Sequence, residues 1–202
     1  MKLIVITTPA FFVEEDKIIT ALFEEGLDIL HLRKPDSVPM YSERLLTLIP
    51  DKYHKQIVTH DHFYMKDEFN LMGIHLNSRN PQVPEEYKGQ VSCSCHSINE
   101  VKIEKEYCDY VFMSPVFDSI SKEGYHSAYT HEEIEQAVNE KVIDKKVMAL
   151  GGICAGNILR IKKYGFGGAV VLGDLWNCFD ACDNCDYKGI IEHFRKLRDL
   201  CE

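Results

Sequence analysis

The sequence predicts an α/β protein, a single (β/α)8 TIM barrel that occupies residues 1–202. Eight short, β-branched apolar runs recur along the chain, as expected for parallel strands covered on both faces. Patterns typical of amphipathic helices separate most of these runs. No linker or low-complexity segment interrupts the alternation of strand and helix within 202 residues, which favours one compact barrel.

The eight expected strands follow one another at short intervals. They are Leu3–Thr7, Asp28–Arg33, Gln56–His60, Met72–Leu76, Val91–Cys95, Tyr110–Ser114, Val147–Leu150 and Gly168–Leu172. An open, doubly wound sheet is the alternative. It is disfavoured because Thr7-Thr8-Pro9 follows the first run, where that fold usually has a glycine-rich turn.

Apolar stripes and capping residues mark the expected helices. The stripes are Ile18/Leu22/Phe23 ending at Gly26, Leu45/Leu46/Ile49, Ile158/Leu159/Ile161 ending at Gly165, and Ile190/Ile191/Phe194/Leu197. Capping boxes at Ser97–Glu100 and Thr130–Glu133 predict two further helix starts. The third and fourth units are the weakest, because residues 63–70 and 85–88 allow only short helices.

Composition limits the classes of partner. The net charge of −9 disfavours general attraction to nucleic acid or to an anionic membrane, and no apolar run is long enough to span a bilayer. Residues 1–7 are interpreted as a buried strand rather than a signal peptide, so a cytoplasmic location and free thiols for the eight cysteines are expected. A homodimer is the default expectation for such a barrel.

Polar residues cluster where the expected strands end, which is where barrels place their active sites. His31 and Arg33 lie two residues apart and should point the same way. The next strands end in His60-Asp61, in His75 with Asn77 and Asn80, and in Ser94 with His96. Cys93 and Cys95 should face the helices instead. A single such residue is usually structural, but their recurrence at successive strand ends predicts a functional site.

The last two strands end in glycines. Gly151-Gly152 follows the seventh run, and Leu172-Gly173-Asp174 follows the eighth. Glycine lets backbone N–H groups approach a ligand closely, and these two loops often hold phosphate in barrels, although tight turns alone are the simpler explanation. The loop between Pro115 and Thr130 is long enough to act as a mobile lid.

Segments at the ends of seven strands together resemble a known family. They are His31-Leu32-Arg33-Lys34-Pro35, His60-Asp61, Gly73–Asn80, Ser94-Cys95-His96-Ser97, Ser114–Lys122, Leu150-Gly151-Gly152-Ile153 and Gly168–Gly173. In order, they are similar to the Q-x-R-x-K, N-D, G-V-H-L-G-Q-x-D, S-x-H-T, G-P-I-F-x-T-x-T-K, I-G-G-I and phosphate-loop motifs of thiamine phosphate synthase (thiamine phosphate pyrophosphorylase) and its relatives, the thiazole tautomerases.

The resemblance implies a reaction and a set of roles. A synthase joins an aminopyrimidine diphosphate to a thiazole phosphate and releases diphosphate. Mg2+ would be held by Asp61 and Asn80, and diphosphate would be gripped by Arg33, Ser119, Ser121 and Lys122. The thiazole phosphate would lie on the loops of Gly151, Gly152, Leu172 and Gly173. The expected catalytic residues are Arg33, Lys122, Ser94, His31 and His60.

Four motif positions depart from the family pattern, all on the metal and diphosphate side. They are His31 in place of Gln, Pro35 in place of Lys, His60 in place of Asn and Asn80 in place of Asp. The changes predict a weaker Mg2+ site and leave open a thiazole tautomerase or a non-catalytic relative that binds thiazole phosphate. Pro115, where the tautomerases place a catalytic His, and the retained Asp61 and Lys122 favour the synthase.

Cys178, Cys182 and Cys185 have the C-x3-C-x2-C spacing of an iron–sulfur cluster motif. That motif follows an early strand in barrel enzymes, whereas this one follows the last strand. Zn2+ with Cys201 or His193 as a fourth ligand is a further alternative. Free thiols in a polar loop are the preferred interpretation.

Overall fold

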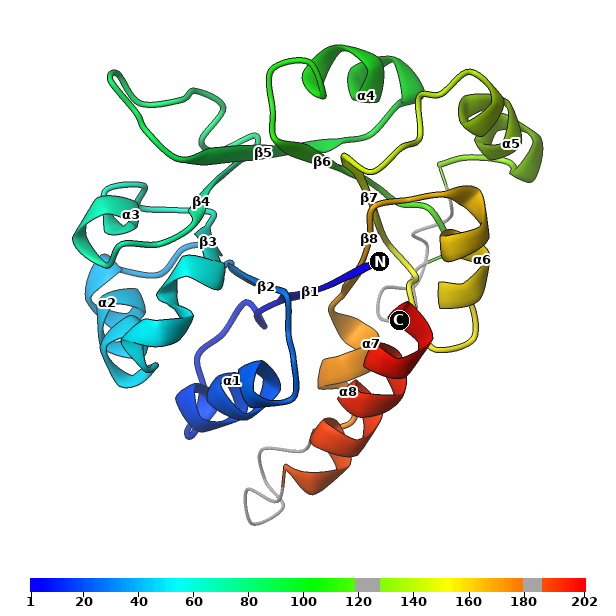
Figure 1. Cartoon of the computed structure of the whole chain (residues 1–202). Coiled ribbons are helices and arrows are strands. Elements are labelled where there is room, and N and C mark those ends of the chain that lie inside the picture. Colours follow the sequence, from blue (N-terminus) through cyan, green and yellow to red (C-terminus); the bar gives the residue numbers. More distant parts are fainter. Residues whose placement is uncertain (119–127, 180–186) are drawn as a thin grey trace.

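Eight parallel strands close into a barrel in the computed structural model, which describes residues 1–118, 128–179 and 187–202 (Figure 1). The strands are β1 Lys2–Ile6, β2 Ile29–Leu32, β3 Ile57–Thr59, β4 Gly73–Leu76, β5 Gln90–Cys95, β6 Tyr110–Met113, β7 Val147–Leu150 and β8 Gly168–Val171. Each strand pairs with the next, and β8 pairs with β1 to complete the circle. All eight predicted strands are confirmed, with each end within one residue of its expected position.

Helices surround the barrel and fill the connections (Figure 1). They are α1 Glu15–Glu24, α2 Pro39–Leu48, the 3-10 helix η1 Asp51–Gln56, α3 Met65–Glu68, α4 Ile98–Glu104, α5 His131–Asn139, α6 Ile158–Tyr164, α7 Gly173–Trp176 and α8 Lys188–Cys201. The (β/α)8 barrel predicted from the sequence is therefore confirmed. Among the described residues, no helix has the length and apolar character that a bilayer crossing requires.

The third and fourth units are reduced, as their weak patterns indicated. Helix α3 has a single turn. The short helix expected at residues 85–88 is wrong, because this segment forms only a turn. Pro84 removes a backbone donor and Glu86 adopts a left-handed conformation with φ of 56°, so a helix cannot continue here.

Capping residues fix two of the helix starts. Thr130 and Glu133 form the predicted reciprocal capping box at the start of α5. Ser97 caps α4 by accepting a hydrogen bond from the Glu100 N–H at 3.1 Å, but the Glu100 carboxylate accepts from the His96 N–H and the Ser97 hydroxyl instead of from the Ser97 N–H. In this second capping box, the Glu100 side chain therefore binds the backbone N–H one residue before the N-cap residue.

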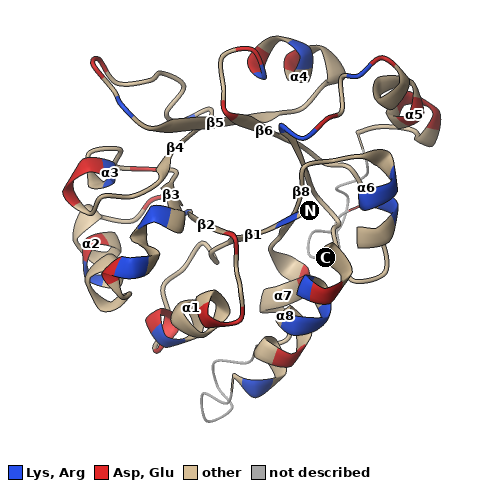
Figure 2. Ribbon diagram, in the orientation of Figure 1, with Lys and Arg blue, Asp and Glu red and all other residues tan. Residues whose placement is uncertain are grey.

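Two apolar cores stabilise the fold. One fills the barrel and consists of Ile4, Ile6, Ile29, Val58, Tyr110, Phe112, Met148 and Val170. The larger one lies between the strands and the helices and includes Leu3, Val5 and Cys95 from the outward faces of strands. Figure 2 shows charged residues of both signs interspersed over the surrounding helices and loops. Alternation along each strand thus sends one set of side chains into the barrel and the next to the helices.

Candidate active site

A cavity of about 690 Å³ opens at the end of the barrel where the strands terminate. The seven strands β2 to β8 and the loops that follow them supply its polar lining, which includes Arg33, His60, Arg79, Ser94, His96, Ser114, Gly151, Gly152, Gly173 and Asp174. Ile6, Phe112 and Val170 of the barrel core form the apolar floor. An amphipathic cavity of this size at this end of a barrel suits a small ring-containing ligand that carries phosphate.

Most of the residues singled out from the sequence meet at this cavity. Arg33, His60, Ser94, Gly151, Gly152, Leu172 and Gly173 all line it. His31 does not, because it is fully buried one layer below the mouth. Ser119, Ser121 and Lys122 lie outside the described residues, as does most of the loop expected to act as a lid. Their proposed roles stay predictions.

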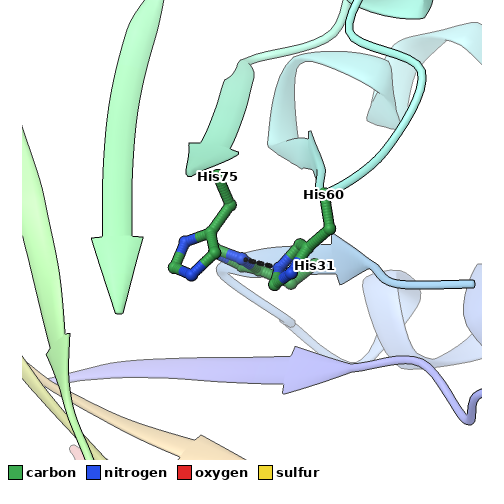
Figure 3. Close-up of side chains that lie close together, drawn as sticks. All are labelled: His31, His60 and His75. Carbon is green, nitrogen blue, oxygen red and sulfur yellow. Dashed lines mark hydrogen bonds between the residues drawn. The ribbon is translucent and has the colours of Figure 1, made fainter. Parts of the chain in front are cut away.

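Three histidines form a polar sector inside the barrel, next to the cavity (Figure 3). His31 comes from β2, His60 directly follows β3, and His75 comes from β4. His31 Nδ1 lies 2.8 Å from His60 Nε2, and His31 Nε2 lies 2.8 Å from the Tyr110 hydroxyl. A neutral imidazole has one donor and one acceptor nitrogen, so His31 can bridge His60 and Tyr110 without any charge.

His75 completes this sector through two serines of β5. Its Nδ1 lies 2.9 Å from Ser92 Oγ, and its Nε2 lies 2.9 Å from Ser94 Oγ. The chain of contacts therefore reaches the cavity at two points, His60 and Ser94. Buried polar groups that are satisfied in this way rigidify their surroundings. The histidine sector holds Ser94 and His60 in place at the cavity wall.

Burial keeps all three rings neutral. It lowers the pKa of His75 to about 3, with a smaller contribution from the Arg33 charge. It also lowers the pKa values of His31 and His60 well below the usual value of 6.5. A group with so low a pKa is a poor proton acceptor near neutral pH. The geometry thus assigns these histidines to hydrogen bonding more readily than to proton transfer.

The three histidines also have nitrogen atoms close enough to suggest a metal site, within 4.8 Å of one another. Two observations oppose it. The rings of His60 and His75 are stacked, with centroids 4.2 Å apart and 22° between planes, so their in-plane lone pairs do not converge. Both nitrogens of His31 and of His75 already have hydrogen-bond partners. The arrangement fits a metal-free network.

Asp61 and Asn80, the predicted metal ligands, are neighbours beside the cavity-lining Arg79, but neither of them is among the residues that line the cavity. Asn80 Nδ2 donates to Asp61 Oδ1 at 3.1 Å. Arg79, which lines the cavity, pairs with the same carboxylate at 3.1 Å. Asn77 Oδ1 accepts from the N–H groups of both Arg79 and Asn80 and shapes the turn that brings them there. Sequence reasoning missed Arg79, because its direction depends on this turn.

Lys34 does not replace the basic residue that Pro35 lacks. Its ammonium is buried on the outer side of the barrel, 2.6 Å from the Glu15 carboxylate at the start of α1. The other arginine that lines the cavity is Arg79, whose charge, after burial, contributes to lowering the pKa of Arg33. Two arginines therefore supply the positive field that an anionic ligand needs in a protein with net charge −9.

The glycine loop after β7 packs tightly against the loop after β6. Gly151 and Gly152 have φ values of 97° and 63°, which other residues rarely adopt. A side chain at Gly152 would place its Cβ 2.2 Å from the Asp118 carbonyl oxygen. The Phe117 N–H donates to the Gly151 carbonyl at 3.1 Å and ties the loops together. These glycines are needed for loop contact as well as for ligand approach.

We therefore expect Gly152→Ala to reduce turnover on the order of 100-fold, because the clash displaces both loops at the cavity. Gly165→Ala is the matched control. Gly165 also has a positive φ of 84°, but a Cβ there would meet nothing within 4 Å. The measurement is steady-state kinetics of both variants. Equal losses in the two variants would show that backbone strain, rather than loop contact, is responsible.

The C-x3-C-x2-C hypothesis stays a prediction, because Cys182 and Cys185 lie outside the described residues. Cys178 is exposed. His193, a suggested fourth ligand, pairs at 2.7 Å with Asp174 at the cavity rim. Cys201, the other suggestion, is buried in the outer core.

Comparison with known proteins agrees with the site. Residues 3–175 match the family model described as thiamine monophosphate synthase. A thiamine-phosphate synthase of Halalkalibacterium halodurans is 27% identical over 184 residues, covering 85% of this chain and 86% of the relative. A Dictyoglomus thermophilum thiamine-phosphate synthase is 25% identical over 157 residues, 73% of this chain and 70% of the relative.

Solved structures give the same result. The crystal structure of a thiamine phosphate pyrophosphorylase from Bacteroides thetaiotaomicron is 68% identical, with a TM-score of 0.93 over 99% of this chain and 97% of the other. A thiamine phosphate pyrophosphorylase from Pyrococcus furiosus shares the fold, with 20% identity and a TM-score of 0.74 over 99% and 95%. The family model alone covers more than half of the sequence, so this chain belongs to the thiamine monophosphate synthase family.

Proposed function

We propose that the protein is a thiamine-phosphate synthase, a transferase that joins 4-amino-2-methyl-5-hydroxymethylpyrimidine diphosphate to thiazole phosphate. The observation that carries the proposal is the layout of the cavity. Arg33 and Arg79 lie on one side, the glycine loops after β7 and β8 lie on the other, and an apolar floor lies between them. This layout suits two phosphorylated rings held face to face. Its relatives with curated names are thiamine-phosphate synthases.

The chemistry requires positioning and charge more than proton transfer. The bond between the pyrimidine methylene carbon and the diphosphate oxygen breaks, the electron pair leaves with diphosphate, and the thiazole nitrogen supplies the pair for the new carbon–nitrogen bond. The pyrimidine is cationic between the two events. Fixed positive groups near the leaving oxygens stabilise the charge that develops there. A site whose buried histidines are neutral is compatible with such a reaction.

The residues then take the following roles. Arg33 and Lys122 act catalytically by neutralising the departing diphosphate, which Ser119 and Ser121 also bind. Backbone N–H groups of Gly151, Gly152, Leu172 and Gly173 hold the thiazole phosphate. Ser94 and His60 line the pocket between the two anion sites, and His31 orients His60 from below.

Asp61 and Asn80 fit a Mg2+ ion that takes its remaining ligands from substrate and water. A carboxylate and an amide oxygen are ligands that Mg2+ accepts, and the Asn80 amide, whose Nδ2 donates to Asp61 in this structure, would turn its oxygen to the ion. When bound, the ion would neutralise the leaving group. The Asp61 carboxylate pairs with Arg79 in this structure. Arg79 is partly exposed and can turn from Asp61 towards the diphosphate.

Arg79 is proposed to supply the diphosphate contact that Pro35 cannot. We expect Arg79→Gln to raise the KM for the pyrimidine diphosphate by about 10–100-fold and to leave the KM for thiazole phosphate within about twofold. Arg79→Lys should retain part of the affinity. Arg44→Gln, on the exposed face of α2, is the control for a lost surface charge. A rise in both KM values alike would contradict this assignment.

The proposal is tested by incubating the purified protein with both substrates and Mg2+ and measuring thiamine phosphate after oxidation to fluorescent thiochrome. Formation of thiamine phosphate is expected only when both substrates are present. No product above the blank without enzyme would overturn the synthase proposal. Isomerisation of a carboxylated thiazole phosphate would then be the next assay.

A further inference from the structure

Three thiols and a carboxylate meet on the outer side of β5, away from the histidine sector. Cys93 and Cys95 point outward from β5, and Cys108 lies in the turn between α4 and β6. All three are buried, with exposures of 6%, 0% and 4%. Glu104, the last residue of α4, directs its carboxylate at them. We call these four residues the thiol cluster.

The distances within the thiol cluster are those of a coordination site. Cys93 Sγ lies 3.9 Å from Cys95 Sγ and 4.0 Å from Glu104 Oε2. The ligand atoms of Cys93, Glu104 and Cys108 all lie within 4.8 Å of one another. In a tetrahedral zinc site with Zn–S bonds of about 2.3 Å, two sulfur atoms are about 3.8 Å apart. The cluster therefore needs only small shifts to enclose an ion.

The carboxylate is the feature that hydrophobic packing does not explain. Buried cysteines often act as small apolar residues. Glu104 is half-buried and places its carboxylate beside these thiols, where apolar packing does not call for a charged group. Within the part of the chain that the structure describes, Glu104 pairs with no lysine or arginine, and its hydrogen-bond partner is the Cys93 thiol. A cation bound between the sulfur atoms and Glu104 would pair with this carboxylate.

We propose that Cys93, Cys108 and Glu104 bind a soft divalent cation of the zinc type, with Cys95 beside the fourth coordination position. Binding releases one proton from each coordinating thiol to the solvent, and no oxidation is involved. The thiolates, rather than the carboxylate, select Zn2+ over Mg2+. The site is separate from the Asp61–Asn80 pair, so it does not rest on the proposed function.

An ion can reach the thiol cluster from the cavity, because Cys93 and Glu104 both line it. Once bound, it would join the end of α4 to β5, where Ser94 faces the cavity. The expected role is structural. The histidine sector is a weaker candidate, because its nitrogen atoms already hydrogen-bond to one another and to hydroxyl groups.

The test starts from a background protein in which Cys178, Cys182 and Cys185 are replaced by Ser, so that the C-terminal thiols cannot bind the ion. The reduced protein is titrated with Zn2+ against a chromophoric chelator. One ion per chain is expected. Cys93→Ser and Cys108→Ser should each weaken binding by on the order of 100-fold. Cys201→Ser is the matched control, because it removes a buried thiol outside the cluster.

Cobalt substitution tests the ligands without relying on a cluster variant. Co2+ added to the background protein should give an intense thiolate-to-metal absorption band in the near ultraviolet and the visible bands of tetrahedral coordination. Glu104→Gln should keep the thiolate band and weaken binding about tenfold. Absence of the thiolate band in the folded background protein would overturn the proposal. So would a folded Cys108→Ser variant that shows the band at unchanged intensity and with unchanged affinity for Co2+.

Discussion

When the pH is lowered from 7.5 to 5.5, the free energy of unfolding is expected to fall by about 3 kcal/mol less in a His31→Gln/His60→Asn double variant than in the parent. Burial lowers the pKa of both histidines below the unfolded value of 6.5. Below pH 6.5 the unfolded chain therefore binds protons that the folded protein excludes. Stability is full above pH 6.5 and is lost as the pH falls, by about 1.4 kcal/mol per histidine at pH 5.5.

The comparison with the parent separates the pH dependence caused by His31 and His60 from that of the other titratable groups. Glu15 works in the opposite direction, because burial raises its pKa to about 7, but it is present in both proteins. Amide side chains at the two positions keep hydrogen-bonding capacity without titrating. Urea unfolding at the two pH values is the measurement, with His131→Gln on exposed α5 as the control. Equal pH dependence in parent and double variant would refute the assignment of these rings as neutral buried groups.

Lys34→Met is expected to reduce the free energy of unfolding by about 3–5 kcal/mol. Lys34 and Glu15 form an ion pair of 2.6 Å in which both side chains are almost fully buried. Removing the ammonium leaves Glu15 buried without its partner, and Glu15 Oε2 already has no hydrogen-bond partner among the described residues. Most domains are stable by only about 5–15 kcal/mol, so the variant should unfold at markedly lower denaturant.

A second variant separates the ion pair from simple packing. Glu15→Leu combined with Lys34→Met removes both charges, and its stability is expected within about 1 kcal/mol of the parent. Denaturant midpoints of the parent, single and double variants are compared at pH 7.5. If the double variant is as unstable as Lys34→Met alone, the loss comes from the altered shape rather than from an unpaired charge.

The strands, and the end of the barrel at which the cavity lies, were predictable because the alternation of side-chain direction along a strand is a local property. The apolar runs gave each strand end within one residue. The expectation that Cys93 and Cys95 face the helices is confirmed by their place in the outer core. His31 and Arg33 point the same way, as expected. Their depth was not predictable, because it depends on how neighbouring strands are staggered, and His31 lies a full layer below the cavity.

Residues whose direction depends on loops or on distant elements could not be placed from sequence. Lys34 stands one position from a motif lysine, yet it faces α1 and pairs with Glu15 across 19 residues of chain. Arg79 enters the cavity through the turn held by Asn77. Cys108 and Glu104 join Cys93 only because α4 packs against β5. Such meetings follow from tertiary packing, which composition and periodicity do not specify.

The measurement that tests the central claim most directly is the rate of thiamine phosphate formation, with and without Mg2+, in the parent and in Asp61→Ala. Asp51→Ala, at the exposed start of η1, is the control. The account predicts metal-dependent product in the parent and in Asp51→Ala and a loss of at least about 100-fold in Asp61→Ala. Product that forms equally well without metal, or in Asp61→Ala, would contradict the assignment of diphosphate chemistry to this rim of the barrel.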